Sequence, residues 1–175
     1  GADVTGVDTS KTFIKLATAG QIVAKKEGGK IVIYEKLRED QVIKTHWIKK
    51  EYHAYHFGTK LLETILGSKK FDFPKSLYLV SDILRLTSKE DAVILDFFAG
   101  SGTTGHAVLE LNSEDGGTRQ FILCTNNENN NGNGHGGIAE GVCYPRIKKV
   151  IEGYKDLSGN AVAGLGGNLR YYMGE

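Results

Sequence analysis

The sequence is poor in the residues that define several classes of protein. Its 175 residues include two prolines, two cysteines, one tryptophan and one methionine. Cys124 and Cys143 form no C-x-x-C pair, so neither a disulfide framework nor a zinc site is predicted, and a reducing compartment fits. No apolar run is long enough to cross a membrane, and no secretory signal is visible. We therefore expect a cytoplasmic globular domain with no membrane association, alone or with an appendage.

Net charge is also small, at +1, but it is unevenly distributed. Counted from Lys, Arg, Asp and Glu, residues 1–60 carry +4 and residues 61–175 carry −3. The basic part also holds Trp47, Tyr52 and Tyr55, a mixture typical of a nucleic-acid surface and equally of an aromatic cluster beneath a loop. His53 and His56 have a spacing that suits a metal, but no third ligand lies nearby in the sequence, so a metal site is not predicted.

The most informative stretch is residues 92–112, which read Ala-Val-Ile-Leu-Asp-Phe-Phe-Ala-Gly-Ser-Gly-Thr-Thr-Gly-His-Ala-Val-Leu-Glu-Leu-Asn. Residues 92–95 have the length and composition of a buried parallel strand. Gly100, Gly102 and Gly105 follow with the spacing G-x-G-x-x-G, and after Gly102 the apolar residues recur with helical periodicity. A strand, a glycine turn and a helix N-terminus together are typical of a site that holds a nucleotide-like ligand against backbone N–H groups.

The residues around the glycines discriminate between the ligands that use such a turn. A P-loop needs a lysine after its last glycine, and His106 occupies that position. A nicotinamide site fits the glycines, but the acidic and bulky sequence at 96–98 is unfavourable for a pyrophosphate and favourable for an ammonium or sulfonium group. A purely structural strand-to-helix turn is the remaining alternative.

The rest of the chain predicts alternating elements. We expect strands at 13–16 and 30–34 joined as a hairpin, helices at 59–66, 75–86 and 143–154, and further strands at 121–125 and 169–173. Gly67 is expected to end the first of these helices. The alternation from residue 91 onward predicts a small parallel sheet with helices packed on it. The Asn/Gly-rich residues 129–137 are expected to form a loop with no site of their own.

Several stretches, in this order, resemble one family. They are residues 58–62 (Gly-Thr-Lys-Leu-Leu), 71–75 (Phe-Asp-Phe-Pro-Lys), 96–104, 125–129 (Thr-Asn-Asn-Glu-Asn), 144–154 (Tyr-Pro-Arg-Ile-Lys-Lys-Val-Ile-Glu-Gly-Tyr) and 167–172 (Gly-Asn-Leu-Arg-Tyr-Tyr). The family is that of the modification (Mod) subunits of type III restriction–modification systems, DNA adenine-N6 methyltransferases of the permuted β class. The resemblance implies part of a Rossmann-like, S-adenosylmethionine-dependent α/β methyltransferase fold: a parallel sheet with flanking helices, preceded by a small β-hairpin region.

The resemblance also implies a division of labour along the chain. Residues 1–57 correspond to the tail of a target-recognition region, and residues 58–175 to the part that binds S-adenosyl-L-methionine. The implied donor-binding residues are Phe71, Asp72, Phe73, Pro74, Lys75, Ser76, Asp96, Phe97, Phe98, Ala99, Gly100, Ser101, Gly102, Thr103, Thr104, Thr125, Asn126, Asn127 and Glu128. Lys75 would pair with the donor carboxylate, and residues 125–128 would reach its ribose and adenine.

The sequence departs from the family in three ways. Thr125 and Asn126 stand where the second strand usually ends in an acid, so Glu128 is the expected substitute, and residues 130–137 look like an insertion. The Asp-Pro-Pro-Tyr motif, which would hold the target amino group and stack on a flipped base, is absent, because Pro74 and Pro145 are not adjacent. The chain therefore resembles a C-terminal piece, with no catalytic residue of its own and no expected activity alone. Duplex DNA, a restriction (Res) subunit and a second Mod copy are the implied partners. A nicotinamide oxidoreductase and a non-catalytic interaction module remain the alternatives, and a cytosine amino group remains an alternative target.

Overall fold

The computed structural model describes residues 9–20, 22–27, 30–35, 46–128 and 137–173. The chain divides into two compact units, Gly1–Trp47 and Ile48–Glu175, and each is described by itself. Among the described residues, no helix combines the length and the apolar character needed to cross a bilayer.

The described residues of the first unit form one helix and two antiparallel strands. The helix α1 spans Thr9–Thr18, and β1 (Ile22–Glu27) pairs with β2 (Lys30–Glu35) in a register that runs from Ile22 opposite Glu35 to Glu27 opposite Lys30. The strand expected at 13–16 is wrong, because these residues lie inside α1. Gly20, which has a φ of +66° and donates its N–H to Ala17 O at 3.0 Å, follows the end of this helix instead of joining two strands. The expected turn at Gly28 and Gly29 lies outside the described residues.

The second unit is built on a two-stranded parallel sheet, so the chain is a mixed α/β protein. The strand β3 (Val93–Asp96) pairs with β4 (Gln120–Leu123) from Val93 opposite Gln120 to Asp96 opposite Leu123. Helix α4 (Thr103–Asp115) makes the connection. The predicted order of strand, glycine turn, helix and strand is thereby confirmed, but the expected burial of the strand at 92–95 is wrong, because Val93 and Leu95 are more than half exposed. A parallel register brings the carboxyl ends of both strands to one edge of the sheet, where ligands bind in α/β proteins.

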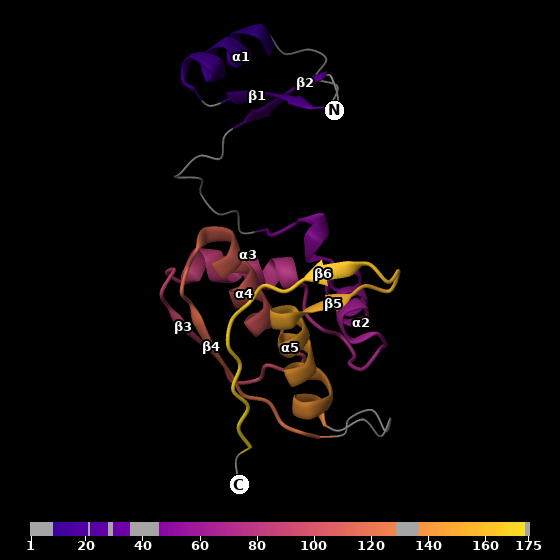
Figure 1. Ribbon diagram of the computed structural model, residues 1–175. Coiled ribbons are helices and arrows are strands. Elements are labelled where there is room, and N and C mark those ends of the chain that lie inside the picture. Colours follow the sequence, from indigo (N-terminus) through magenta and orange to yellow (C-terminus); the bar gives the residue numbers. More distant parts are fainter. Residues whose placement is uncertain (1–8, 21, 28–29, 36–45, 129–136, 174–175) are drawn as a thin grey trace. The chain divides into compact units, whose positions relative to one another are not determined.

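Helices lie on one side of this sheet, and α4 packs directly against β4. Figure 1 shows α3 (Leu77–Thr87), α4 and α5 (Tyr144–Glu152) on the same side of β3 and β4, and α2 (Leu61–Leu66) packs against α5. Two buried clusters fill the space between the elements: Leu77, Leu84, Ala107, Val108 and Leu111 from α3 and α4, and Leu62, Ile65, Leu66, Leu109, Val142, Ile147 and Val150 chiefly from α2 and α5. On the other face of the sheet, Val93, Leu95 and Ile122 are more than half exposed. The helices thus cover one face of the sheet.

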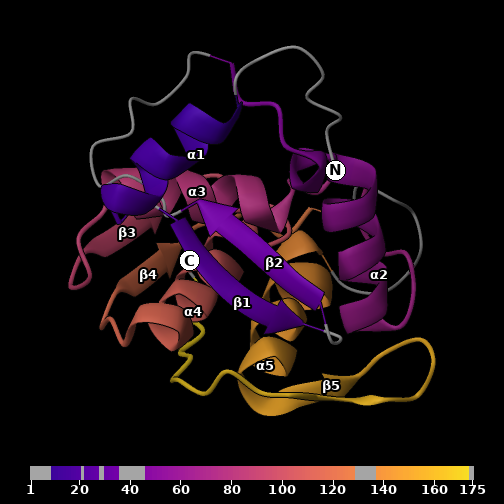
Figure 2. The same cartoon turned by 90° about the horizontal axis from the view of Figure 1, so that it is seen from above.

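Shorter elements complete the unit, and Figure 2 shows α2, α5 and β5 from a second direction. They are a 3₁₀ turn at Lys50–Tyr52 (η1), single π-helical turns at Tyr55–Lys60 (η2) and Ala139–Cys143 (η3), and a pair of antiparallel strands, β5 (Gly153–Lys155) and β6 (Ala161–Ala163). The sequence did not predict β5 and β6. It placed a strand at 169–173 instead, but residues 164–173 have no regular secondary structure.

Candidate functional site

The glycine turn joins the end of β3 to the start of α4. Gly100 and Gly102 have positive φ values of +49° and +78°, and the Gly102 N–H donates to Ala99 O at 2.7 Å. A Cβ added to Gly102 would lie 2.9 Å from Cys143 Sγ, so the turn packs directly against the end of η3. Glycine is required here both for the left-handed backbone and for the close approach.

Asp96 shapes this turn from within. Its Oδ1 accepts a hydrogen bond from the Phe98 N–H at 3.1 Å, and its Oδ2 accepts one from the Thr104 hydroxyl at 2.5 Å. One carboxylate therefore fixes both ends of the turn. The first turn of α4 contributes N–H groups that have no acceptor within the helix, and the helix dipole makes this end positive.

The turn presents some side chains to solvent and buries others. Phe97 and Phe98 are 67% and 89% exposed, and their rings meet edge to face at 5.5 Å. Ser101 and Thr103 are buried, with exposures of 3% and 5%. A bound molecule would therefore meet the two aromatic rings and the backbone before it met the hydroxyl groups.

A buried arginine lies beneath the hydroxyl groups. Arg146 of α5 donates through one terminal nitrogen to Thr103 Oγ1 at 2.8 Å and Ser101 Oγ at 3.1 Å, and its other terminal nitrogen lies 3.3 Å from His106 Nδ1. Burial lowers the pKa of Arg146 to about 10, so it stays protonated at neutral pH. Burial and then the charge of Arg146 hold the pKa of His106 well below its ordinary value, so the imidazole is neutral. The sequence analysis gave Arg146 no role. Its position next to the apolar Ile147 of α5 was a signal that this charged side chain could be buried.

The stretch at 71–76 reaches the glycine turn through one residue. A Cβ added to Gly100 would lie 3.3 Å from Phe71 Cζ, so the Phe71 ring covers that glycine. Phe73 is 86% exposed and has a φ of +55°, a strained conformation for a residue with a side chain. Asp72 pairs with Lys69 at 2.7 Å, and Lys75 is exposed.

Two further contacts fix the 71–76 stretch. Ser76 is buried, caps α3 by accepting the Leu79 N–H at 3.4 Å, and donates its hydroxyl to Glu51 O at 2.7 Å. Its hydroxyl is thus committed to the fold. A Cβ added to Gly58 would lie 2.4 Å from Pro74 O, so η2 packs against this stretch backbone to backbone.

Residues 125–128 follow β4 at the same edge of the sheet. The Ala99 N–H donates to Cys124 O at 3.0 Å, which ties the end of β4 to the glycine turn. Thr125 is half-buried, and Asn126, Asn127 and Glu128 are exposed. Asn127 Oδ1 accepts the Glu140 N–H at 3.2 Å. The structure thus brings the 96–104 and 125–128 groups together, with Phe71 beside them.

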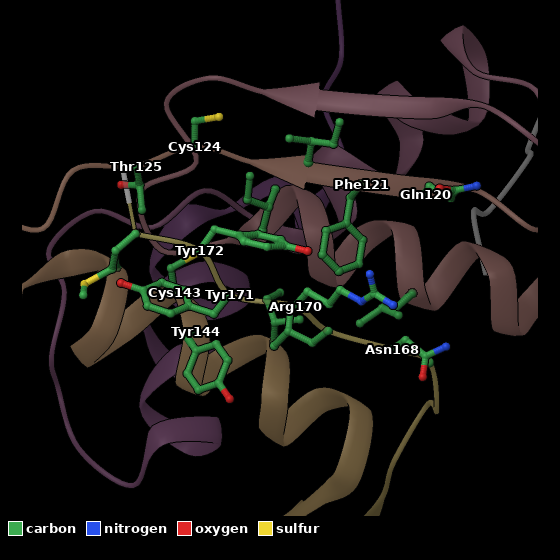
Figure 3. Close-up of a pocket in the computed structure, with 18 of the residues that line it drawn as sticks. Gln120, Phe121, Cys124, Thr125, Cys143, Tyr144, Asn168, Arg170, Tyr171 and Tyr172 are labelled. Carbon is green, nitrogen blue, oxygen red and sulfur yellow. The ribbon is translucent and has the colours of Figure 1, made fainter. Parts of the chain in front are cut away.

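A pocket of about 960 Å³ lies alongside β4 (Figure 3). Of the residues predicted to bind a donor, it includes Thr125 and Asn127, and its other walls include Phe121, Tyr144 and Tyr171. The rings of Tyr144 and Tyr171 lie 5.3 Å apart. The pocket was not predicted, because residues 169–173 were expected to form a strand.

Other candidates from the sequence form no comparable site. The rings of His53 and His56 lie 5.1 Å apart, but within the part of the chain that the structure describes no group of three or more His, Cys, Asp or Glu residues is arranged to hold a metal. Tyr55 is half-exposed, and the Lys60 ammonium lies over its ring, with 5.5 Å between Nζ and the ring centre.

Comparison with known proteins gives consistent matches. A family model described as DNA methylase matches residues 9–130. The StyLTI Mod subunit, a type III restriction–modification enzyme of Salmonella typhimurium, is 39% identical over 117 residues, which are 65% of this chain and 18% of that protein. The corresponding EcoPI Mod subunit of Escherichia phage P1 is 44% identical over 85 residues, 49% of this chain and 13% of the relative. The type II methyltransferase M.KpnI of Klebsiella pneumoniae is 46% identical over 85 residues, 49% of this chain and 20% of the relative. The chain thus spans a fifth or less of the length of these relatives.

Proposed function

The chain belongs to the DNA methylase family, and from this premise we infer that it is the donor-binding portion of a site-specific DNA methyltransferase. Its ligand would be S-adenosyl-L-methionine, whose sulfonium group supplies an electrophilic methyl group. The observation that carries the proposal is the turn anchored by Asp96 at the N-terminus of α4, with the polar residues 125–128 beside it. Such an arrangement fits a nucleoside with a charged amino-acid tail.

The residues present are suited to the separate parts of this donor. The carboxylate of Asp96 places negative charge near the turn, which favours a sulfonium or ammonium group. Exposed Phe97 and Phe98 offer aromatic surface to the same cation. Asn126, Asn127 and Glu128 offer exposed polar groups for ribose hydroxyls. Within this proposal the two-stranded sheet and its helices are part of a Rossmann-like fold, residues 58–175 are the donor-binding part, and residues 1–57 are the tail of a target-recognition region.

The proposed whole enzyme transfers the methyl group to the adenine amino nitrogen of duplex DNA. We propose that the whole enzyme is a type III Mod subunit, because two of the similar proteins are named type III restriction–modification Mod subunits. Its proposed partners are a second Mod copy and a Res subunit. The similarity to a type II methyltransferase supports the alternative of an enzyme that works without a Res subunit. Co-purification of a Res subunit with the full-length protein would distinguish the two.

A calorimetric titration tests the donor assignment. We expect residues 1–175 to bind S-adenosylhomocysteine more tightly than NAD, and Asp96→Ala to lower the affinity substantially, because the substitution removes both acceptors that hold the turn. Asp82→Ala is the matched control: Asp82 on α3 also accepts side-chain hydrogen bonds, from Lys49, Tyr52 and Arg85, but none of these partners belongs to the glycine turn. Equal binding by Asp96→Ala and the wild type would remove Asp96 from the site. Tighter binding of NAD would reject the methyltransferase assignment.

An activity assay tests the missing catalytic motif. Adenine's amino nitrogen is a weak nucleophile and needs positioned acceptors for its protons, which the family's Asp-Pro-Pro-Tyr segment would supply. We therefore propose that residues 1–175 alone transfer no methyl group, and that the full-length protein does. The measurement is incorporation of radiolabel from the donor into duplex DNA. Comparable rates for both would place the catalytic residues in this chain.

A further inference from the structure

Arg146 is the largest of the fully buried side chains among the described residues, and it contacts the glycine turn from its buried side. It is fully buried, and its terminal nitrogens are directed to Ser101, Thr103 and His106. It also donates to the Ser101 carbonyl oxygen at 3.4 Å. One side chain of α5 therefore holds the residues on both sides of Gly102, where the turn becomes helix α4.

Stability of the fold does not explain an arginine at this position. The hydrogen-bond partners of the guanidinium are two hydroxyls, a carbonyl and a neutral imidazole, and its Nε has no hydrogen-bond partner within the described residues. The Glu110 carboxylate acts on the guanidinium through space. A buried charge loses much of its solvation energy, and replacing such a group by an apolar side chain of similar volume is often neutral or stabilising. The arginine is therefore better explained by what it does to the turn.

The geometry suggests what that effect is. The hydroxyls of Ser101 and Thr103 lie 3.3 Å apart, and Arg146 is within hydrogen-bond distance of both. The carboxylate of Asp96 holds the same turn through the Phe98 N–H and the Thr104 hydroxyl. Two groups of opposite charge thus hold the turn, and the guanidinium contacts Thr103, the first residue of α4.

We propose that Arg146 is a positioning residue for the methyl-donor site, which fixes Ser101, Thr103 and the first turn of α4 in the shape that receives the donor. This inference rests on the proposed function. Arg146 does not touch the donor, because it is fully buried beneath the turn. Its effect reaches the donor through the backbone of residues 101–103.

The test compares Arg146→Met and Arg146→Lys in the full-length protein. We expect Arg146→Met to weaken S-adenosylhomocysteine binding at least tenfold, with the protein still folded by circular dichroism, because an unbranched apolar side chain fills the volume but holds neither hydroxyl. Arg146→Lys keeps a charge and one donor, so it should restore part of the affinity. Lys149→Met is the matched control, since Lys149 lies on the same helix and donates to Ile65 O at 2.9 Å, away from the turn. It should change affinity less than twofold.

A second pair of variants keeps Arg146 in place. Thr103→Val removes the hydroxyl that Arg146 holds, and Thr103→Ser retains it. We expect Thr103→Val to weaken binding about as much as Arg146→Met and to add little to it in the double variant. Thr103→Ser should bind more tightly than Thr103→Val, because it keeps the hydroxyl. If the Arg146 variants do not fold, this pair decides the matter.

The outcomes separate the two proposals. If the wild type does not bind S-adenosylhomocysteine, the proposed function fails. If the wild type binds, and Arg146→Met or Thr103→Val binds equally well, the positioning role is overturned. Equal losses of affinity in Arg146→Met and Lys149→Met would also overturn it, because they would show a general effect of α5.

Discussion

Gly102 allows a substitution whose cost can be worked out from the structure, because a second glycine of the same helix serves as its control. Gly102 precedes α4 with a φ of +78°, and Gly116 follows it with a φ of +73°. A Cβ on Gly102 would lie 2.9 Å from Cys143 Sγ, whereas a Cβ on Gly116 would meet no atom within 4 Å. Alanine at either position has the same backbone strain, but only Gly102→Ala adds a steric conflict.

The expected magnitudes follow from this difference. Left-handed backbone costs a residue with a side chain about 1–2 kcal/mol, so Gly116→Ala should lower the free energy of unfolding by that amount. Overpacking adds roughly 1–3 kcal/mol, so Gly102→Ala should cost about 2–5 kcal/mol in total. Removing the sulfur with Cys143→Ala should recover part of the additional loss. Urea unfolding followed by circular dichroism measures all three.

Ligand affinity provides the second measurement for the same variants. Gly102→Ala should weaken S-adenosylhomocysteine binding, because the turn must move away from Cys143, while Gly116→Ala should leave it unchanged. Equal stability losses in the two variants, with no relief from Cys143→Ala, would refute the close packing of the turn against Cys143.

The other predictions concern groups buried near the same turn. The pKa of His106 in the folded chain is held below its unfolded value near 6.5, so below that pH the unfolded chain binds a proton that the folded chain does not. The free energy of unfolding should therefore fall as pH decreases below about 6.5, by at most about 1.4 kcal/mol per pH unit. The charged groups that face His106 are Arg146 and Glu110, the latter at 3.7 Å. Urea unfolding between pH 7.5 and 5.5 should show that this dependence on pH is weaker in His106→Gln than in the wild type. An unchanged dependence would contradict the lowered pKa of His106. Burial raises the pKa of the Cys143 thiol to about 11, so that little reactive thiolate is present at pH 8. Iodoacetamide at pH 8 should therefore modify the half-buried Cys124 before Cys143, as followed by mass spectrometry of the peptides. Faster modification of Cys143 would contradict this prediction.

Sequence patterns predicted the elements whose signals are local. The apolar run before Asp96, the glycines and the periodicity of Ala107, Val108 and Leu111 gave β3, the turn and α4 correctly. Gly67 ends α2 as expected, with a φ of +81° and its N–H donated to Glu63 O. In these places the backbone conformation is set by residues close in sequence.

Elements that depend on distant partners were missed. Phe13 and Leu16 are apolar enough for a strand, but they lie three residues apart on one side of a helix, and the strand at 30–34 that was expected to pair with them pairs with Ile22–Glu27 instead. The hydrogen bonds of the Ser76 hydroxyl with the Leu79 N–H and the Glu51 carbonyl oxygen were not predicted either, because the contact with Glu51 is one that only the fold creates. The link between Arg146 and Ser101 spans 45 positions of sequence for the same reason.

The contact of Gly58 with Pro74 has a consequence for evolution and for the construction of chimeras. A side chain at 58 would overlap the Pro74 carbonyl oxygen and lie 2.9 Å from that of Lys75, so neither segment tolerates an arbitrary partner. The Gly-Thr-Lys sequence and the Phe-Asp-Phe-Pro-Lys sequence must therefore be compatible with each other, although α2 separates them along the chain. A chimera of this chain with a relative should therefore have its junction on the N-terminal side of residue 58, so that both segments come from the same parent.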